Sequence, residues 1–270
     1  MQLKNLVVGV IRWGIKRPRT KIFLCVLFVF HAFVEAATLK YAPVNGRQAV
    51  PLSADNTYFR TSSVAAPDYW SLASFYVPQY NDYACSAASV SMALNALLNA
   101  RRMRGDYDEN ILSPVLPEKI AGDKWKELLS VPGFNGRHGV SLSQLGMIAN
   151  EAMVTYSSST FSVTITTAAA VNTQNLETFR QALILNENSS SDILLLHFVQ
   201  DRVTGAPDGP YPHVSPVGAY DAKTRRVLIF DVDRRWYEPY WAADTQVFDA
   251  MAFETKSFGH GGYVLIKIDR

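Results

Sequence analysis

Residues 79–98 read Gln-Tyr-Asn-Asp-Tyr-Ala-Cys-Ser-Ala-Ala-Ser-Val-Ser-Met-Ala-Leu-Asn-Ala-Leu-Leu, and Cys85 is the seventh of them. The apolar residues from Val90 onward recur at helical spacing, so the sequence predicts a helix over 84–98 that begins beside the cysteine. Because a helix N-terminus carries partial positive charge, it stabilises a thiolate there. Cys85 is therefore a candidate nucleophile. The alternative is a buried structural cysteine, which behaves as a small hydrophobe.

The rest of the chain changes from helices to strands. Further helical segments are predicted over 118–129 and over 175–185. Another helix is predicted to begin after an N-cap at Ser141 or Ser143. Strands are predicted over 161–168, 192–199, 214–220, 226–232 and 262–268. Helices followed by an antiparallel sheet are typical of an α+β domain.

Two polar residues mark the predicted hairpin of strands 214–220 and 226–232. Pairing Tyr220 with Arg225 across the turn 221–224 places His213 opposite or nearly opposite Asp231. A carboxylate beside an imidazole fixes its tautomer and supports its protonated form. The alternative is an ordinary ion pair at a strand end. With Cys85 as the nucleophile, however, His213 would be its base and Asp231 the carboxylate that orients the base.

Gln79 lies six residues before Cys85. Its side-chain amide and the backbone N–H of Cys85 can together donate to a developing oxyanion. Taken alone, Gln79 also fits an exposed loop glutamine, so the spacing is informative only together with the cysteine.

The N-terminus predicts a leader. A basic segment precedes an apolar run over 22–34, and small residues follow it, so residues 1–36 read as a signal peptide cut after Ala36. The run is shorter than the roughly 20 residues of a membrane span. The expected location is therefore periplasmic or secreted, with an uncleaved anchor formed by 22–34 as the alternative. Residues 37–65 are expected to form a strap and 66–270 the catalytic domain.

The leader also dominates the charge of the chain. The formal net charge is +2, and without residues 1–36 it becomes −3, with 20 basic and 23 acidic residues. A nucleic-acid partner is therefore not expected. Cys25 lies in the leader and Cys85 is the only other cysteine, so no disulfide is predicted in the mature chain. The histidines show no paired ligand spacing, and no metal site is predicted.

Several motifs resemble the phytochelatin synthase family in order and spacing. They lie in residues 75–97, in Gly139–Gly146, in the His-Val-Ser-Pro that starts at His213, and in the Asp-Val-Asp-Arg that starts at Asp231. The resemblance covers roughly residues 70–270 and implies a papain-like cysteine peptidase fold, with a helical lobe carrying the nucleophile and an antiparallel sheet carrying His and Asp. It matches Cys85, His213 and Asp231 to the catalytic triad and Gln79 to the oxyanion-hole glutamine. Arg234 matches an arginine that follows the triad aspartate in the family, and by its chemistry it can pair with a substrate carboxylate. Arg234 and Tyr237 are the predicted substrate-binding residues.

The resemblance further implies attack on the Cys–Gly bond of glutathione, a γ-glutamylcysteinyl thioester, and release of glycine. The acyl group then passes to water, giving hydrolysis, or to a second glutathione, giving phytochelatin. Because no cysteine-rich extension follows, the chain is similar to the short bacterial members, and hydrolysis is expected to prevail. No cofactor is expected, and cadmium or zinc would enter only as a metal–glutathione thiolate substrate.

The sequence departs from the family pattern at two places. Ser86 stands where the family usually has glycine after the nucleophile, and His260-Gly261-Gly262 stands where a basic residue usually precedes the last strand. Two other functions remain open: a papain-like peptidase that processes other peptides, and a non-catalytic periplasmic thiol-peptide binding protein. A homodimer is also an open alternative.

Overall fold

The computed structural model describes residues 40–61, 64–98, 111–120 and 122–269. These residues all belong to one compact unit, Thr38–Arg270. The predicted leader, including the apolar run over 22–34, lies outside the described residues. Among the described residues, no helix has the length and apolar character needed to cross a membrane.

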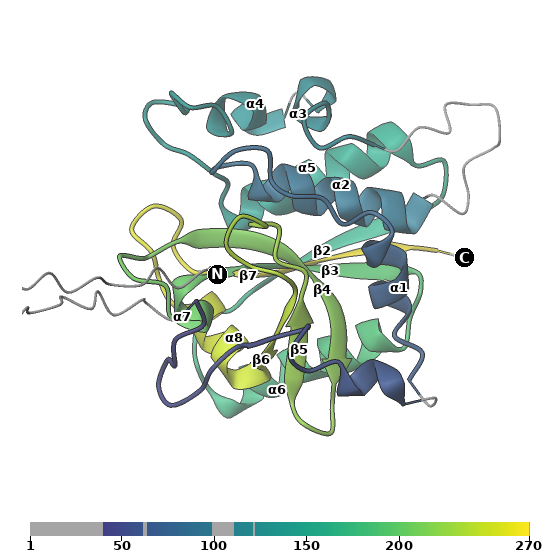
Figure 1. Ribbon diagram of the computed structural model, residues 1–270. Helices are drawn as coiled ribbons and strands as arrows, with labels where there is room; N and C mark the ends of the chain where they lie inside the picture. Colours follow the sequence, from purple (N-terminus) through teal and green to yellow (C-terminus); the bar gives the residue numbers. More distant parts are fainter. Residues whose placement is uncertain (1–39, 62–63, 99–110, 121, 270) are drawn as a thin grey trace, which may run out of the picture. The chain divides into compact units, whose positions relative to one another are not determined.

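A seven-stranded antiparallel sheet forms the centre of this unit (Figure 1). Its strand order is β1-β6-β5-β4-β3-β7-β2. The strands, with their bounds, are β1 Val50–Pro51, β2 Phe161–Thr167, β3 Asp192–Val199, β4 Pro212–Asp221, β5 Arg226–Ile229, β6 Tyr240–Ala243 and β7 Gly262–Ile268. The predicted α+β class is confirmed, and every predicted strand is present.

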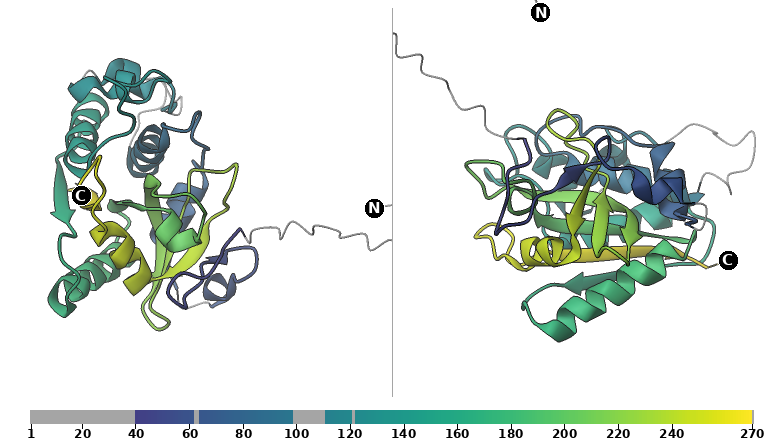
Figure 2. Two further views of the ribbon diagram at one scale, coloured as in Figure 1. Left: turned by 90° about the vertical axis from the view of Figure 1, so that its left-hand side faces the viewer. Right: turned by 60° about the horizontal axis from the view of Figure 1, so that its bottom comes forward.

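Helices cover both faces of the sheet (Figures 1 and 2). On one face lie α2 Cys85–Leu98, α5 Leu142–Tyr156 and the short segments α3 Leu116–Lys119, η3 Gly122–Lys124 and α4 Trp125–Leu128. On the other lie α6 Thr173–Glu187 and α8 Asp244–Ala252. The remaining elements are η1 Thr57–Arg60, α1 Pro67–Ala73 and α7 Asp201–Thr204.

The interior strand β3 shows how the sheet is buried from both sides. All eight of its residues are buried. Ile193 and Leu195 join the core beneath α2 and α5, whereas Leu194 and Leu196 join the core beneath α6 and α8. An uninterrupted apolar run is what a strand covered on both faces requires, which explains why its bounds were predictable.

The predicted register of the β4–β5 hairpin is wrong. Asp221 pairs with Arg226 and Val217 pairs with Ile229, with a register shift around Gly218. The ring of Phe230 packs over this glycine, where an added Cβ would lie 2.3 Å from a ring atom. A bulge at this position follows from that close approach.

Candidate active site

Cys85 is the first residue of α2 and lines a cavity of about 1110 Å³. Local hydrogen bonds set the approach to the helix, because the side chain of Asn81 accepts from the backbone N–H of Tyr83 at 2.9 Å and donates to the carbonyl of Leu129 at 2.8 Å. The next residue, Ser86, is buried, and its Oγ accepts from Nε1 of Trp125 at 2.9 Å. The segment from Asn81 to Ser86, which contains Cys85, is therefore held by hydrogen bonds to Leu129 at one end and to Trp125 at the other.

The helix α2 rests directly on the strand that carries the histidine. Nearly all of α2 is buried, and its small side chains permit a close approach to β4. Oγ of Ser89 donates to the carbonyl of Val214 at 2.9 Å, one residue from His213. The helix start and the histidine are thus held together by packing and by a direct hydrogen bond.

His213 and Asp231 form the predicted pair, although by a different route. Nε2 of His213 lies 2.9 Å from Oδ1 of Asp231. The partner of His213 in the sheet is Phe198 of β3, and β5 ends at Ile229, before Asp231. The aspartate therefore reaches the histidine from the segment after the strand and not from a paired strand position.

The carboxylate of Asp231 is fully buried, and four donors surround it. Oδ1 faces His213 and accepts from the backbone N–H of Asp233 at 2.9 Å. Oδ2 accepts from Nε2 of Gln200 and from the hydroxyl of Tyr240, each at 2.9 Å. Burial, the largest influence, raises the pKa of Asp231, but His213, Gln200 and the Asp233 N–H lower it, with a net decrease.

These contacts also determine the state of the histidine. Burial alone would lower the pKa of His213, but Asp231 and then Cys85 raise it well above its usual value. Because a carboxylate only accepts, Nε2 of His213 donates to Asp231, which leaves Nδ1 for the thiol. The arrangement places an imidazole with a raised pKa beside the thiol of Cys85, as the base of a cysteine nucleophile is placed.

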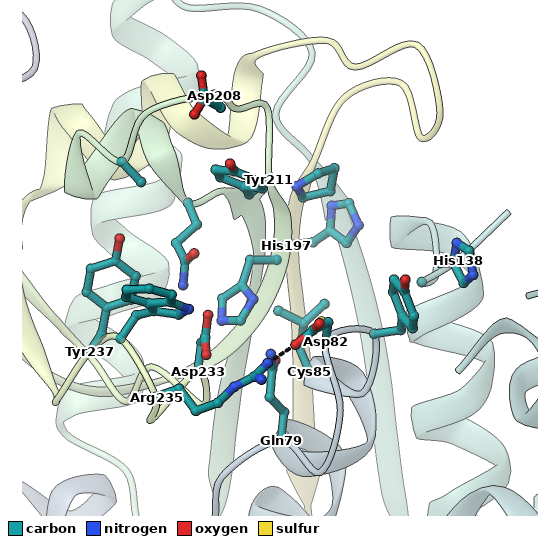
Figure 3. Close-up of a pocket in the computed structure, with 18 of the residues that line it drawn as sticks. Gln79, Asp82, Cys85, His138, His197, Asp208, Tyr211, Asp233, Arg235 and Tyr237 are labelled. Carbon is teal, nitrogen blue, oxygen red and sulfur yellow. Dashed lines mark ion pairs between the residues drawn. The ribbon is translucent and has the colours of Figure 1, made fainter. Parts of the chain in front are cut away.

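Gln79 lines the same cavity as Cys85 (Figure 3). Its backbone N–H donates to the carbonyl of Val232 at 2.8 Å, which ties this loop to the residue after Asp231. Its Oε1 is buried and has no hydrogen-bond partner. The structure thus brings Gln79 to the wall that carries the nucleophile, as an oxyanion role requires.

The two predicted substrate-binding residues differ in placement. Tyr237 lines the cavity, is buried, and donates from its hydroxyl to Oγ1 of Thr204 at 3.1 Å. Arg234 is exposed and does not line the cavity, because its guanidinium packs on the ring of Tyr76 at 4.5 Å from the centroid. The next residue, Arg235, lines the cavity and pairs with Asp82 (Figure 3).

Several residues of the site were not predicted from the sequence. Gln200 and Tyr240 hold Asp231, and His197 and Asp233 line the cavity. Gln200 directly follows the predicted strand 192–199, which was the only local sign of its position. No group of three or more His, Cys, Asp or Glu side chains suited to a metal ion occurs in the part of the chain that the structure describes.

A thiol at a helix start, its imidazole and a buried carboxylate define a Cys–His–Asp site on an α+β fold. Comparison with known families identifies its lineage: the phytochelatin synthase model matches residues 48–263, which contain every residue of this site. The chain belongs to the phytochelatin synthase family.

Curated relatives agree with this assignment. The chain is 25% identical over 207 residues to glutathione gamma-glutamylcysteinyltransferase 3 of Lotus japonicus, a match that covers 73% of this chain and 37% of that protein. It is 26% identical over 204 residues to glutathione gamma-glutamylcysteinyltransferase 2 of Arabidopsis thaliana, covering 73% and 39%. It is 25% identical over 206 residues to the glutathione gamma-glutamylcysteinyltransferase of Schizosaccharomyces pombe, a match that covers 74% of this chain and 43% of that protein. The chain spans about two fifths of the length of these relatives.

Proposed function

We propose that this chain is a glutathione γ-glutamylcysteinyltransferase that acts through a thioester on Cys85. The observation that carries the proposal is that the imidazole of His213, on the wall of the cavity beside Cys85, contacts both Cys85 and the buried Asp231. The names of the relatives supply the reaction class. The fold that we propose for this arrangement is the papain-like one.

The proposed chemistry follows from the state of the pair. The thiolate of Cys85 attacks the carbonyl carbon of the Cys–Gly bond, and the imidazolium of His213 gives its proton to the departing glycine amine. The C–N bond breaks as the thioester remains on sulfur. His213, now neutral, then takes a proton from the acceptor, which is water in hydrolysis or the amine of a second glutathione in phytochelatin synthesis. The acceptor bonds to the thioester carbon, the C–S bond breaks, and the thiolate of Cys85 and the imidazolium of His213 are restored. Gln79 and the backbone N–H of Cys85 donate to the oxyanion in each half-reaction.

The charges around the cavity suit a small zwitterionic peptide. Lys40 and Arg235 are cations on its wall, and either can receive a substrate carboxylate. Ligand pockets are commonly about 300–1,000 Å³, so a cavity of about 1110 Å³ leaves room for an acceptor beside a bound acyl group. This size supports transfer to a second peptide as well as to water.

The proposal extends to location and metals. Export through residues 1–36 would place the enzyme in the periplasm or outside the cell. Cadmium or zinc would act as a thiolate complex of the substrate and not as a resident cofactor.

The test is to incubate the full chain with glutathione and to measure free glycine, γ-glutamylcysteine and phytochelatin, with and without cadmium. Glycine release together with a γ-glutamylcysteinyl adduct on Cys85 is the expected result, and Cys85→Ser should abolish both. Glycine release that persists in Cys85→Ser would overturn the proposed nucleophile. Cleavage of other peptides without cleavage of glutathione would favour the general peptidase.

A further inference from the structure

Besides Oε1 of Gln79, two acceptors of residues on the cavity wall have no hydrogen-bond partner. They are Nδ1 of His197 and Oδ1 of Asp233, and both atoms are buried. Buried polar groups are nearly always paired, and leaving one unpaired is unfavourable. Neither residue has a role in the proposed chemistry of Cys85, so the unpaired atoms point to a ligand that arrives with donors.

The protonation of His197 follows from its partner. This residue of β3 is 3% exposed, and its Nε2 lies 2.9 Å from the carbonyl of Val140. Because a carbonyl only accepts, Nε2 carries the proton. Burial, and then His213, lower the pKa of His197 against the opposing bond to Val140, so the ring is neutral. Its Nδ1 therefore carries a lone pair without a partner, in a residue that lines the cavity.

Asp233 lies two residues after Asp231, and its side chain lines the cavity (Figure 3). The backbone N–H of Arg235 donates to it, while Oδ1 remains without a partner. The guanidinium of Arg235 pairs with Asp82 instead. Asp233 is thus a half-buried carboxylate that the guanidinium of Arg235 does not pair with. Burial raises the pKa of Asp233, whereas His213 and Lys40 favour its charged form.

We propose that Asp233 recognises the protonated amino group of the substrate and that His197 accepts a further N–H from the same molecule. This inference rests on the proposed function and assigns its substrate class, small peptides whose acyl part carries a free amino group, as the γ-glutamyl group of glutathione does. A blocked amino group carries no charge to pair with Asp233. Because hydrogen bonds between charged groups are the stronger ones, the site should select free amines over acylated ones.

The first test does not depend on turnover. Cys85 in the full chain is modified by aminoethyl methanethiosulfonate, a cation, and by the neutral methyl reagent, and both rates are followed by mass spectrometry of the Cys85 peptide. Asp233→Asn keeps an acceptor for the Arg235 N–H but removes the charge. It should lower the ratio of cationic to neutral rates by about ten-fold or more, and any change in thiol reactivity cancels in that ratio.

Asp208→Asn is the matched control. Asp208 also lines the cavity, is exposed, and has a φ of 65°, which asparagine adopts readily. The ratio should stay near the wild-type value in this variant. An unchanged ratio in Asp233→Asn, or an equal fall in Asp208→Asn, would overturn the assignment of Asp233.

The second test compares glutathione with N-acetylglutathione in the glycine-release assay. The wild type should prefer glutathione, and Asp233→Asn should lose about ten- to a hundred-fold in kcat/KM, mainly through KM, on glutathione alone. His197→Gln retains a donor for Val140 but lacks the Nδ1 acceptor, and should raise KM with kcat little changed. Equal losses on both substrates would contradict the inference. Absence of glycine release from either substrate in the wild type would refute the proposed function, while the thiol test would still decide the role of Asp233.

Discussion

His213 meets Asp231 across a bulged hairpin, with Nε2 and Oδ1 2.9 Å apart, and not as paired strand residues. The aspartate lies beyond the end of β5 and is held by Gln200 and Tyr240, which come from other parts of the chain. The orientation of the imidazole is therefore set by a buried polar network, which is more rigid than a single exposed ion pair.

Replacing this aspartate should shift the alkaline limit of activity. Asp231 raises the pKa of His213, so Asp231→Asn should lower it. Since His213 must be protonated to release glycine, the alkaline limb of kcat/KM should move to lower pH. The measurement is the pH profile of glycine release. If the alkaline limb of kcat/KM does not move in Asp231→Asn, a group other than His213 titrates in that pH range.

The same pair predicts a pH dependence of stability. A histidine whose pKa is raised by folding stabilises the protein fully below its unfolded pKa, and this stabilisation disappears as the pH rises through the folded pKa. The free energy of unfolding of the wild type should therefore fall over that alkaline range. In Asp231→Asn the fall should be smaller, as followed by urea unfolding at a series of pH values.

Gln79→Ala should slow the chemistry without weakening binding. Removing one donor of an oxyanion hole lowers kcat by about 10²–10³-fold, and KM should change little because the donor acts on the developing charge. Alkylation of Cys85 by iodoacetamide serves as the control, since it needs the thiolate but no oxyanion. Equal losses in alkylation and turnover would instead indicate a displaced loop.

Most of the fold could be predicted because its signals are local. Ser141 caps α5 in a capping box with Gln144, and the apolar run 192–199 coincides with β3. The nucleophile at a helix start was equally readable from residues 79–98. Such patterns need only the neighbouring sequence.

The rest depends on contacts between distant residues. The bulge at Gly218 reflects the packing of the Phe230 ring against this glycine. In the turn of the same hairpin Arg225 adopts a positive φ of 57°, although the turn contains no Asn-Gly sequence that would predict such a conformation. Helix α8 was missed although Val247 and Met251 have helical spacing. The partners of Asp231 lie 31 and 9 residues away in the chain, so no spacing rule could identify them.

The two adjacent arginines should differ in their effect on binding. Arg235 lines the cavity, whereas Arg234 packs on Tyr76 outside it. Arg235→Ala should therefore raise KM for glutathione several-fold, through loss of a cation and release of Asp82, and Arg234→Ala should leave KM nearly unchanged. Steady-state kinetics of the two variants decide this. A larger KM effect at Arg234 would support the substrate-binding role predicted for it from the sequence.

Ser86 stands where the family usually has glycine, and its hydroxyl accepts from the buried indole of Trp125. Ser86→Gly should therefore destabilise this chain, because the indole N–H loses its partner at a cost of about 1–3 kcal/mol. Ser86→Ala separates that loss from the flexibility of glycine, and urea unfolding measures both. In a double-mutant cycle with Trp125→Phe, the serine change should matter much less once the donor is gone. If Ser86→Ala lowers the free energy of unfolding equally in both backgrounds, the hydroxyl of Ser86 does not stabilise the protein through its bond to the indole of Trp125.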